Sequence, residues 1–189
     1  MRVLDLGGEA HTWTGSDRRP REVTLLNIPW KAEEQAARLE GRPEGAWLKP
    51  VAGDACNPPE ELLDQPFDLV YSNSVIEHVG GHQRRRAFAY YAQALGEHHW
   101  IQTPNRYFPL EPHWVCPGIH YLPPRARAAV TQVWPIGNYT HRRESLRQRM
   151  GDVLAVELLT ASEMQYYFEA SRIVRERVAG LAKSLIAVR

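Results

Sequence analysis

The sequence lacks the features that mark several large classes of protein. Only two of its 189 residues are cysteine, Cys56 and Cys116, so a disulfide framework is excluded and a reducing compartment is favoured. No apolar run approaches the ~20 residues of a membrane helix, and the N-terminus shows no signal-peptide pattern. With 23 basic and 22 acidic residues, the formal net charge of +1 gives no reason to expect nucleic acid or a membrane as a partner. We therefore expect a cytoplasmic protein.

The composition is otherwise that of an ordinary globular protein, with 43% apolar and 24% charged residues, and we expect residues 1–189 to form a single domain. Short apolar runs alternate with amphipathic helical patterns, which predicts a doubly wound, mostly parallel α/β sheet. The predicted parallel strands are residues 2–6, 22–28, 47–53, 67–71 and 100–103. Two final strands, residues 171–178 and 184–188, are joined by too short a link for a parallel crossover, so they must form an antiparallel hairpin.

The first predicted strand runs directly into two glycines, Gly7 and Gly8. Glycine at a strand end permits a positive φ and a close approach of the backbone to a ligand. Asp5, just before them, can accept a hydrogen bond from a cationic ligand or brace the loop. The G-x-G-x-x-G pattern of a dinucleotide site is absent, because Glu9 and His11 follow, and this disfavours a nucleotide-dependent oxidoreductase.

Small or polar residues also follow three other predicted strands, at the edge where open α/β sheets bind ligands. Asn27 stands roughly 20 positions after Asp5, the offset of a ribose-binding side chain, although a turn-forming role is equally open. Asp54 and Ala55 follow the third strand, and Ser72 begins the polar end of the fourth. The carboxyl edge of the sheet is therefore the predicted binding site.

The stretch FDLVYSNSVIEHV at residues 67–79, together with the acidic residue and glycines after the first strand, resembles motifs of class I S-adenosylmethionine-dependent methyltransferases of the small-molecule, type 11-like branch. The resemblance covers nearly the whole chain. It implies a Rossmann-like sheet and S-adenosylmethionine as the cofactor. The cofactor contacts that it implies are Asp5, Gly7 and Gly8 for the methionine part, Asn27 for the ribose, Asp54 and Ala55 for the adenine, and Ser72. The sequence departs from the family in its altered glycine loop, in the uncharged Asn27, and in having no helical segment before the first strand.

Residues 105–139 form an aromatic-rich and proline-rich stretch with little periodicity, which predicts an insert or lid over the carboxyl edge; a structural insert that covers the core is the alternative. Glu111 and His113 are the candidate catalytic residues, with His120 and His78 behind them. Glu111, His113 and His120 could instead bind a metal ion. Because no H-E-x-x-H or cysteine-rich spacing supports this, we expect no metal site.

Together these features predict a methyltransferase that transfers a methyl group from S-adenosylmethionine to an oxygen or nitrogen of a small molecule. The alternative is a methyltransferase-like binding module without turnover, which the altered glycine loop favours. A cover for the cofactor would come from the insert or from the partner subunit of a homodimer.

Two groups of basic residues are predicted to lie on the surface, outside the site. Arg84, Arg85 and Arg86 form the solvated start of a helix, and His98 and His99 lie at the opposite edge of the sheet from any ligand.

Overall fold

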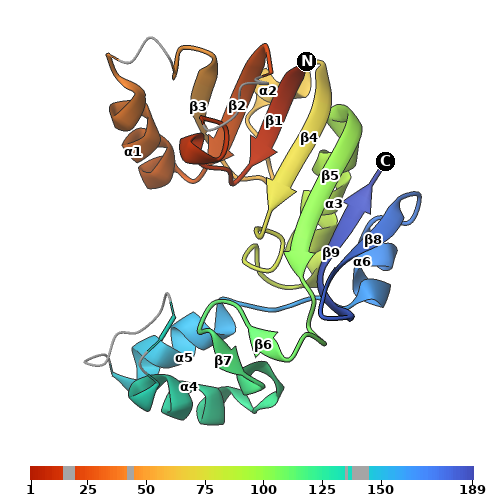
Figure 1. The fold of residues 1–189 in the computed structure, drawn as a ribbon. Coiled ribbons are helices and arrows are strands. Elements are labelled where there is room, and N and C mark those ends of the chain that lie inside the picture. Colours follow the sequence, from red (N-terminus) through yellow and green to blue (C-terminus); the bar gives the residue numbers. More distant parts are fainter. Residues whose placement is uncertain (15–19, 42–44, 135, 138–144) are drawn as a thin grey trace.

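A seven-stranded sheet forms the centre of the computed structural model, which describes residues 1–14, 20–41, 45–134, 136–137 and 145–189. The strand order is β3-β2-β1-β4-β5-β9-β8 (Figure 1). The strands are β1 (Arg2–Leu6), β2 (Glu22–Asn27), β3 (Leu48–Ala52), β4 (Phe67–Asn73), β5 (Gly96–Pro104), β8 (Arg172–Val178) and β9 (Leu181–Val188). The first five pair in parallel, whereas β9 is antiparallel to both β5 and β8. The predicted Rossmann-like sheet with its C-terminal antiparallel hairpin is therefore confirmed.

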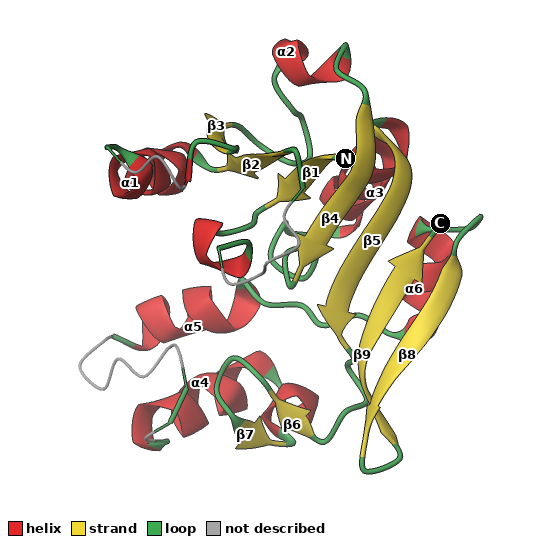
Figure 2. Ribbon diagram, turned by 45° about the horizontal axis from the view of Figure 1, so that its top comes forward, coloured by secondary structure: helices red, strands yellow, loops and turns green. Residues whose placement is uncertain are grey.

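Helices connect the strands of this sheet (Figure 2). They are α1 (Pro29–Leu39), α2 (Glu60–Leu63), α3 (His82–Ala94) and α6 (Ala161–Tyr167), with a 3₁₀ helix at Ala10–Thr12. α1 has Pro29 in its first turn, where the missing N–H would have had no helical partner. α6 begins at a capping box, in which Thr160 and Glu163 each accept a hydrogen bond from the other's backbone N–H.

Alternate strand residues fill two apolar layers, one on each face of the sheet, as the twofold period of a strand requires. The first layer joins Leu4, Leu6, Val70 and Ile101 to Phe88 of α3 and Met164 of α6. The second layer joins Val3, Val23, Leu25 and Leu48 to Trp13 and to Leu39 of α1. Strands buried on both faces form a rigid base, and the loops at their carboxyl ends are positioned by it.

A second, smaller layer of structure lies below the carboxyl ends of β4 and β5 (Figure 1), and we call residues 106–158 the edge unit. Asn105 and Leu159 form an isolated parallel bridge at its base. The edge unit contains β6 (Leu110–Glu111), β7 (Cys116–Pro117), a 3₁₀ helix (Ile119–Tyr121), α4 (Pro124–Val133) and α5 (Leu146–Leu154). The predicted insert at 105–139 overlaps the first part of the edge unit, and its residues 135, 138 and 139 lie outside the described part of the chain.

The edge unit has its own apolar core, centred on the buried Trp114 and Ile119. Ala128 of α4 and Val153 of α5 pack into the same cluster. The aromatic and aliphatic residues of this segment therefore hold a folded unit together, and they fix the position of the polar residues that it carries to the sheet edge.

Two predictions of surface position are wrong. His99 is buried because β5 begins at Gly96 and places it between β4 and β9, where its Nε2 lies 2.8 Å from Ser171 Oγ. Burial, with the nearby charges of Arg189 and His98, lowers the pKa of His99 to about 4. Arg85 is buried too, and its guanidinium bonds the Glu157 carboxylate at 2.5 Å.

Within the described ranges, each helix is too short or too polar to cross a lipid bilayer.

Candidate active site

The carboxyl ends of β1 to β4 surround a cavity of about 450 Å³. Of the predicted cofactor-binding residues, Gly7, Asn27, Asp54 and Ala55 line it. The lining also includes Trp30, Lys31, Ser74, His78 and Arg84, which the sequence did not single out as cofactor contacts. The structure therefore brings four of the seven predicted residues to one cavity.

A larger cavity, of about 550 Å³, lies at the opposite edge of the sheet, where Arg2, Arg21 and Lys49 line it together with Glu22 and Glu61. Size alone would favour this second cavity as a binding site. Open α/β sheets, however, bind ligands at the carboxyl ends of their strands, where loops diverge and backbone groups are free. The smaller cavity is therefore the candidate site.

The loop after β1 requires glycine at two successive positions. Gly7 has a φ of +77°, in the left-handed region, and its N–H donates to Leu26 O at 2.8 Å. At Gly8 the loop passes directly over Asp5, so that a Cβ there would lie 1.8 Å from the carboxylate Oδ2. A side chain at Gly8 would thus collide with the acid that the loop covers.

Asp5 is completely buried beneath this loop and does not line the cavity. The indole Nε1 of Trp13 donates to its Oδ2 at 2.7 Å, whereas its Oδ1 has no hydrogen-bond partner among the described residues. Burial raises the pKa of Asp5 to about 7, even though the hydrogen bond from Trp13 and the charge of Lys31 oppose the shift. Asp5 is thus a buried acid packed directly under the loop at Gly8, with its pKa raised by burial.

Asn27 supports the glycine loop and also borders the cavity. Its Nδ2 donates to the Gly8 carbonyl at 2.6 Å, which holds the glycine loop, and the residue also lines the cavity. Gln35 of α1 makes a parallel contact, since its Nε2 donates to the same carbonyl at 2.9 Å while its Oε1 accepts from Ala10 N–H. The sequence gave no signal for Gln35, because an amide on a helix is usually exposed.

Asp54 forms a two-pronged ion pair with Arg84, whose Nη2 lies 2.9 Å from both carboxylate oxygens. Burial raises the pKa of Asp54, but the hydrogen bonds from the Cys56 backbone and from Arg84 outweigh it, and the pKa lies below its ordinary value. Arg84 is exposed at the start of α3, as predicted, and the structure adds that it pairs with a carboxylate of the cavity lining.

Ser72 lies next to the cavity but outside its lining. It is buried in β4, and its Oγ donates to Leu6 O at 2.9 Å, which fixes the carboxyl end of β1 against β4. Two residues later, Ser74 adopts a left-handed φ of 57° and faces the cavity. Its N–H and Oγ both bond Gln102 Oε1, at 3.1 and 3.0 Å. These contacts hold a backbone conformation that is unusual for serine.

Glu111 and His113, the predicted catalytic pair, are buried in the edge unit and contact each other. His113 Nδ1 lies 2.6 Å from Glu111 Oε1, and the second oxygen of Glu111 accepts from Trp114 N–H at 2.9 Å. His113 Nε2 lies 2.9 Å from His78 Nε2, and His78 in turn lines the cavity. A chain of contacts therefore runs from Glu111 through two imidazoles to the cavity.

Glu77, beside His78, is a further buried acid in this chain. Its Oε2 accepts from Thr103 Oγ1 at 2.9 Å, while its Oε1 has no hydrogen-bond partner within the described residues. Burial raises the pKa of Glu77 to about 7, against the lowering effect of Thr103 and His113. Burial of the His78 ring, together with the nearby charge of His113, lowers the pKa of His78.

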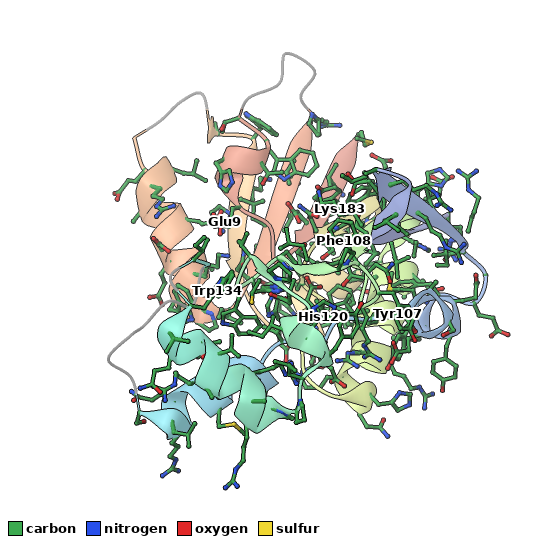
Figure 3. The ribbon with its side chains drawn as sticks, turned by 60° about the horizontal axis from the view of Figure 1, so that its bottom comes forward. Glu9, Tyr107, Phe108, His120, Trp134 and Lys183 are labelled. Carbon is green, nitrogen blue, oxygen red and sulfur yellow. The ribbon has the colours of Figure 1, made fainter. Side chains whose placement is uncertain are left out.

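His120, labelled in Figure 3, is outside the group of Glu77, His78 and His113 and lines a smaller cavity, of about 230 Å³, together with Glu111. Arg106 and Arg127 line the same cavity, and the His120 ring centroid lies 4.0 Å from that of Tyr121. The structure thus does not bring His120 together with His113 as the sequence suggested.

Comparison with solved structures shows that other proteins share this fold. An O-methyltransferase family protein from Burkholderia thailandensis is similar with a TM-score of 0.62 at 14% identity, over 100% of this chain and 50% of that one. The O-methyltransferase NcsB1 of neocarzinostatin biosynthesis, solved with S-adenosylmethionine and 2-hydroxy-5-methyl naphthoic acid, gives a TM-score of 0.56 at 12% identity, over 99% and 47%. A Rhodobacter sphaeroides protein, described provisionally as a Zn-dependent alcohol dehydrogenase, gives 0.63 at 12% identity, over 99% and 82%.

The likeness extends to further O-methyltransferase structures, and the chain spans about half the length of the O-methyltransferases that it matches. No protein-family model matches the sequence, and neither does any curated protein. At these identities the likeness shows only that the chain shares this Rossmann-like fold, and activity has to be argued from the site.

Proposed function

We propose that the chain binds S-adenosylmethionine at the carboxyl edge of the sheet and transfers its methyl group to an oxygen or nitrogen of a small molecule. The observation that carries the proposal is the cavity itself. It lies at the ends of β1 to β4, in a sheet of methyltransferase strand order, beside a glycine loop that encloses a buried acid. The S-adenosylmethionine bound in NcsB1 supports the choice of cofactor.

The residues of the site fit the parts of this cofactor. Trp30 lines the cavity with 63% of its surface exposed, so its ring is available for stacking on a purine. Asp54 and Ala55 lie near it as adenine contacts, and Asn27 has an amide oxygen to offer the ribose. The loop at Gly7 brings backbone groups close to the ligand.

Two predicted contacts act from behind the cavity in this proposal. Asp5 has a carboxylate oxygen beneath the loop that finds no hydrogen-bond partner in the described part of the chain, and a cationic amino group nearby would be favourable to it. Ser72, through its bond to Leu6, supports the strand end from which the loop starts. Neither side chain has to touch the ligand for its loss to weaken binding.

The bound cofactor supplies a methyl group activated by its sulfonium centre. The chain's own contribution is to hold the acceptor in line at contact distance and to take up its proton where one must leave. His78 is the group that faces the cavity. His113 positions it, and Glu111 accepts the N–H of His113, so that the acid stabilises a proton received by the pair of imidazoles.

A binding module without turnover remains the second candidate, and two contacts favour it. Arg84 already occupies the Asp54 carboxylate, and the Asn27 amide nitrogen is engaged by the glycine loop. Both groups would have to share their partners with a ligand. Weak or absent cofactor binding is the outcome that this candidate predicts.

The test is calorimetric titration of the purified chain with S-adenosylmethionine and with S-adenosylhomocysteine, and with NADH as the control. NADH matters because one structural neighbour carries a dehydrogenase description. Micromolar binding of the first two ligands without binding of NADH would support the proposal. Binding of NADH alone would refute it. If the cofactor binds, release of S-adenosylhomocysteine with a panel of hydroxylated and amino aromatic acids identifies the acceptor class.

The setting and partners form part of the same proposal. Cys56 and Cys116 are both free and buried, in keeping with the cytoplasm. A homodimer could cover the cavity mouth, and we propose no nucleic-acid partner, since the formal net charge is only +1.

A further inference from the structure

Three side chains that could bind a metal ion converge at the wall of the candidate cavity. One carboxylate oxygen of Glu77 and one ring nitrogen each of His78 and His113 all lie within 4.8 Å of one another. Two of these residues follow β4, and the third comes from the edge unit, 35 positions along the chain. The set differs from the trio Glu111, His113 and His120 considered from the sequence, because the fold replaces two of its members.

The two imidazoles approach each other through the same ring atom, Nε2. His78 Nε2 and His113 Nε2 lie 2.9 Å apart, with the rings nearly perpendicular at 85°. Two nitrogens bound to one Zn²⁺ at about 2.0–2.1 Å would lie roughly 3 Å apart, because the angle at the ion is between about 90° and 110°. The metal-free spacing is therefore close to that of a bound pair.

Glu77 supplies a carboxylate oxygen that lacks a partner. The residue is only 1% exposed, and Oε1 has no hydrogen bond within the described part of the chain. An unpaired buried carboxylate oxygen is costly, and a cation is the partner that satisfies it best. Thr103 holds the other oxygen at 2.9 Å and thereby orients the carboxylate.

Glu111 completes the arrangement from behind. It accepts the Nδ1–H of His113 at 2.6 Å and is itself fixed by Trp114 N–H. A carboxylate behind a ligating histidine is the usual way in which proteins select the tautomer and orientation of that ring. With Nδ1 protonated, Nε2 of His113 carries the lone pair that a metal ion needs.

We propose that Glu77, His78 and His113 bind a divalent transition-metal ion, with Zn²⁺ or Mn²⁺ fitting the two-nitrogen, one-oxygen donor set. Three protein ligands leave coordination positions open. Because His78 lines the cavity, an ion held by these residues would lie at the cavity wall.

This deepens the proposed function, on which it rests for the reaction step, by assigning the acceptor class as a hydroxyl compound. An ion held by these residues would lower the pKa of a bound acceptor hydroxyl, whose proton would pass to water. The acceptor oxygen would then form the bond to the methyl carbon as the carbon–sulfur bond breaks, with the electron pair left on sulfur. With the ion bound, the ion would promote loss of the acceptor proton, the role that the proposed function gives to His78 and His113 in the metal-free protein.

The test is calorimetric titration of the chelator-treated, dialysed chain with Zn²⁺ and with Mn²⁺, and with Mg²⁺ as the control ion. We expect one site for Zn²⁺ or Mn²⁺ and negligible heat with Mg²⁺, which prefers all-oxygen sites. His78→Gln and Glu77→Gln should each weaken the affinity by about 100-fold or more, and Glu111→Gln by about 10- to 100-fold. His98→Gln, at an exposed histidine on β5, should leave it unchanged.

A second readout guards against variants that fail to fold. Co²⁺ bound to nitrogen and oxygen ligands has a visible absorption band, which the wild type should show and His78→Gln should lose while its far-ultraviolet circular dichroism stays the same. Absence of metal binding by the wild type, or equal binding by His78→Gln and His98→Gln, would overturn the proposal. Because the titration needs no methyl donor, metal binding without cofactor binding would contradict the proposed function alone.

Discussion

The substitution Asp5→Asn should remove a large part of the pH dependence of stability. The wild-type carboxyl group is fully buried, with a pKa of about 7, whereas aspartate in an unfolded chain titrates near 4. Between these values the folded state binds the proton and the unfolded state has lost it. The free energy of unfolding therefore falls as pH rises from about 4, and the loss is complete above about 7.

The magnitude follows from the difference between the two pKa values. Each unit of difference corresponds to about 1.4 kcal/mol, but part of the loss has already occurred at pH 5 because the unfolded chain is ionised there. Between pH 5 and pH 8 the wild type should lose about 2 to 3 kcal/mol through Asp5. The asparagine of the variant cannot titrate, and its amide oxygen can still accept the hydrogen bond from Trp13 Nε1. Any cost from the unpaired NH₂ group of that amide is the same at both pH values.

The assay is urea unfolding of wild type and Asp5→Asn at pH 5 and pH 8, with the free energy of each taken by linear extrapolation. The informative quantity is a double difference: the free energy of unfolding of the variant minus that of wild type is taken at each pH, and the value at pH 5 is subtracted from the value at pH 8. The contributions of the other titrating groups cancel from it. We expect the variant to gain about 2 to 3 kcal/mol relative to wild type on going to pH 8. Parallel pH profiles would show that Asp5 is ionised in the folded protein, and the account of the loop as a cover over a protonated acid would fail.

Three further substitutions probe the loop, the core and the cavity. Gly8→Ala should lower the melting temperature by several degrees or prevent folding, because the new Cβ would lie 1.8 Å from the Asp5 carboxylate. Gly151→Ala, inside α5, is the control, because a Cβ there meets nothing within 4 Å among the described residues beyond its chain neighbours and its own helix backbone, and it should leave the melting temperature unchanged or raise it. Equal melting temperatures would contradict the loop geometry. His99→Gln should make the stability less sensitive to acid. The pKa of His99 is lowered to about 4 in the folded protein, so its contribution to the free energy of unfolding is present above about pH 6.5 and is lost as pH falls toward 4. In urea unfolding, the variant should therefore lose about 2 kcal/mol less than wild type between pH 6.5 and pH 4.5. Trp30→Ala should weaken S-adenosylhomocysteine binding by about 3- to 10-fold in calorimetry if the exposed ring stacks on adenine, and unchanged affinity would remove it from the site.

Local patterns in the sequence were sufficient to predict the sheet. Each signal used depends on a few neighbouring residues: the apolar runs, the glycines after β1 and the short link before β9. The rules for parallel crossovers then allow only a few orders of the strands in the sheet. The position of a polar residue at a strand end likewise predicts the edge at which it lies, which is why Gly7, Asn27, Asp54 and Ala55 reach one cavity. These properties depend on the period of the hydrophobic pattern and on the direction of the chain, and both can be read from the sequence.

Tertiary structure decided which side chains meet. Arg84 and Asp54 are 30 positions apart, and nothing in the periodicity of α3 indicates that its first turn supplies the partner of a loop acid. His99 reads as a polar residue before a strand, yet β5 extends to Gly96 and buries it. A local pattern indicates whether a residue of that type is usually buried. Which two side chains contact each other depends on how distant segments of the chain pack together.

The histidine cluster shows the same division most clearly. The sequence by itself determined that His78 follows β4 and that Glu111 and His113 lie in a segment leaving β5, so all three belong near the carboxyl edge. Only the packing of the edge unit, around Trp114 and against the sheet, brings His113 Nε2 to 2.9 Å from His78 Nε2 and places both near Glu77, whose Oε1 has no hydrogen-bond partner among the residues described. The distance between two side chains on separate units is set by the cores that hold those units, and it is not a property of either segment alone.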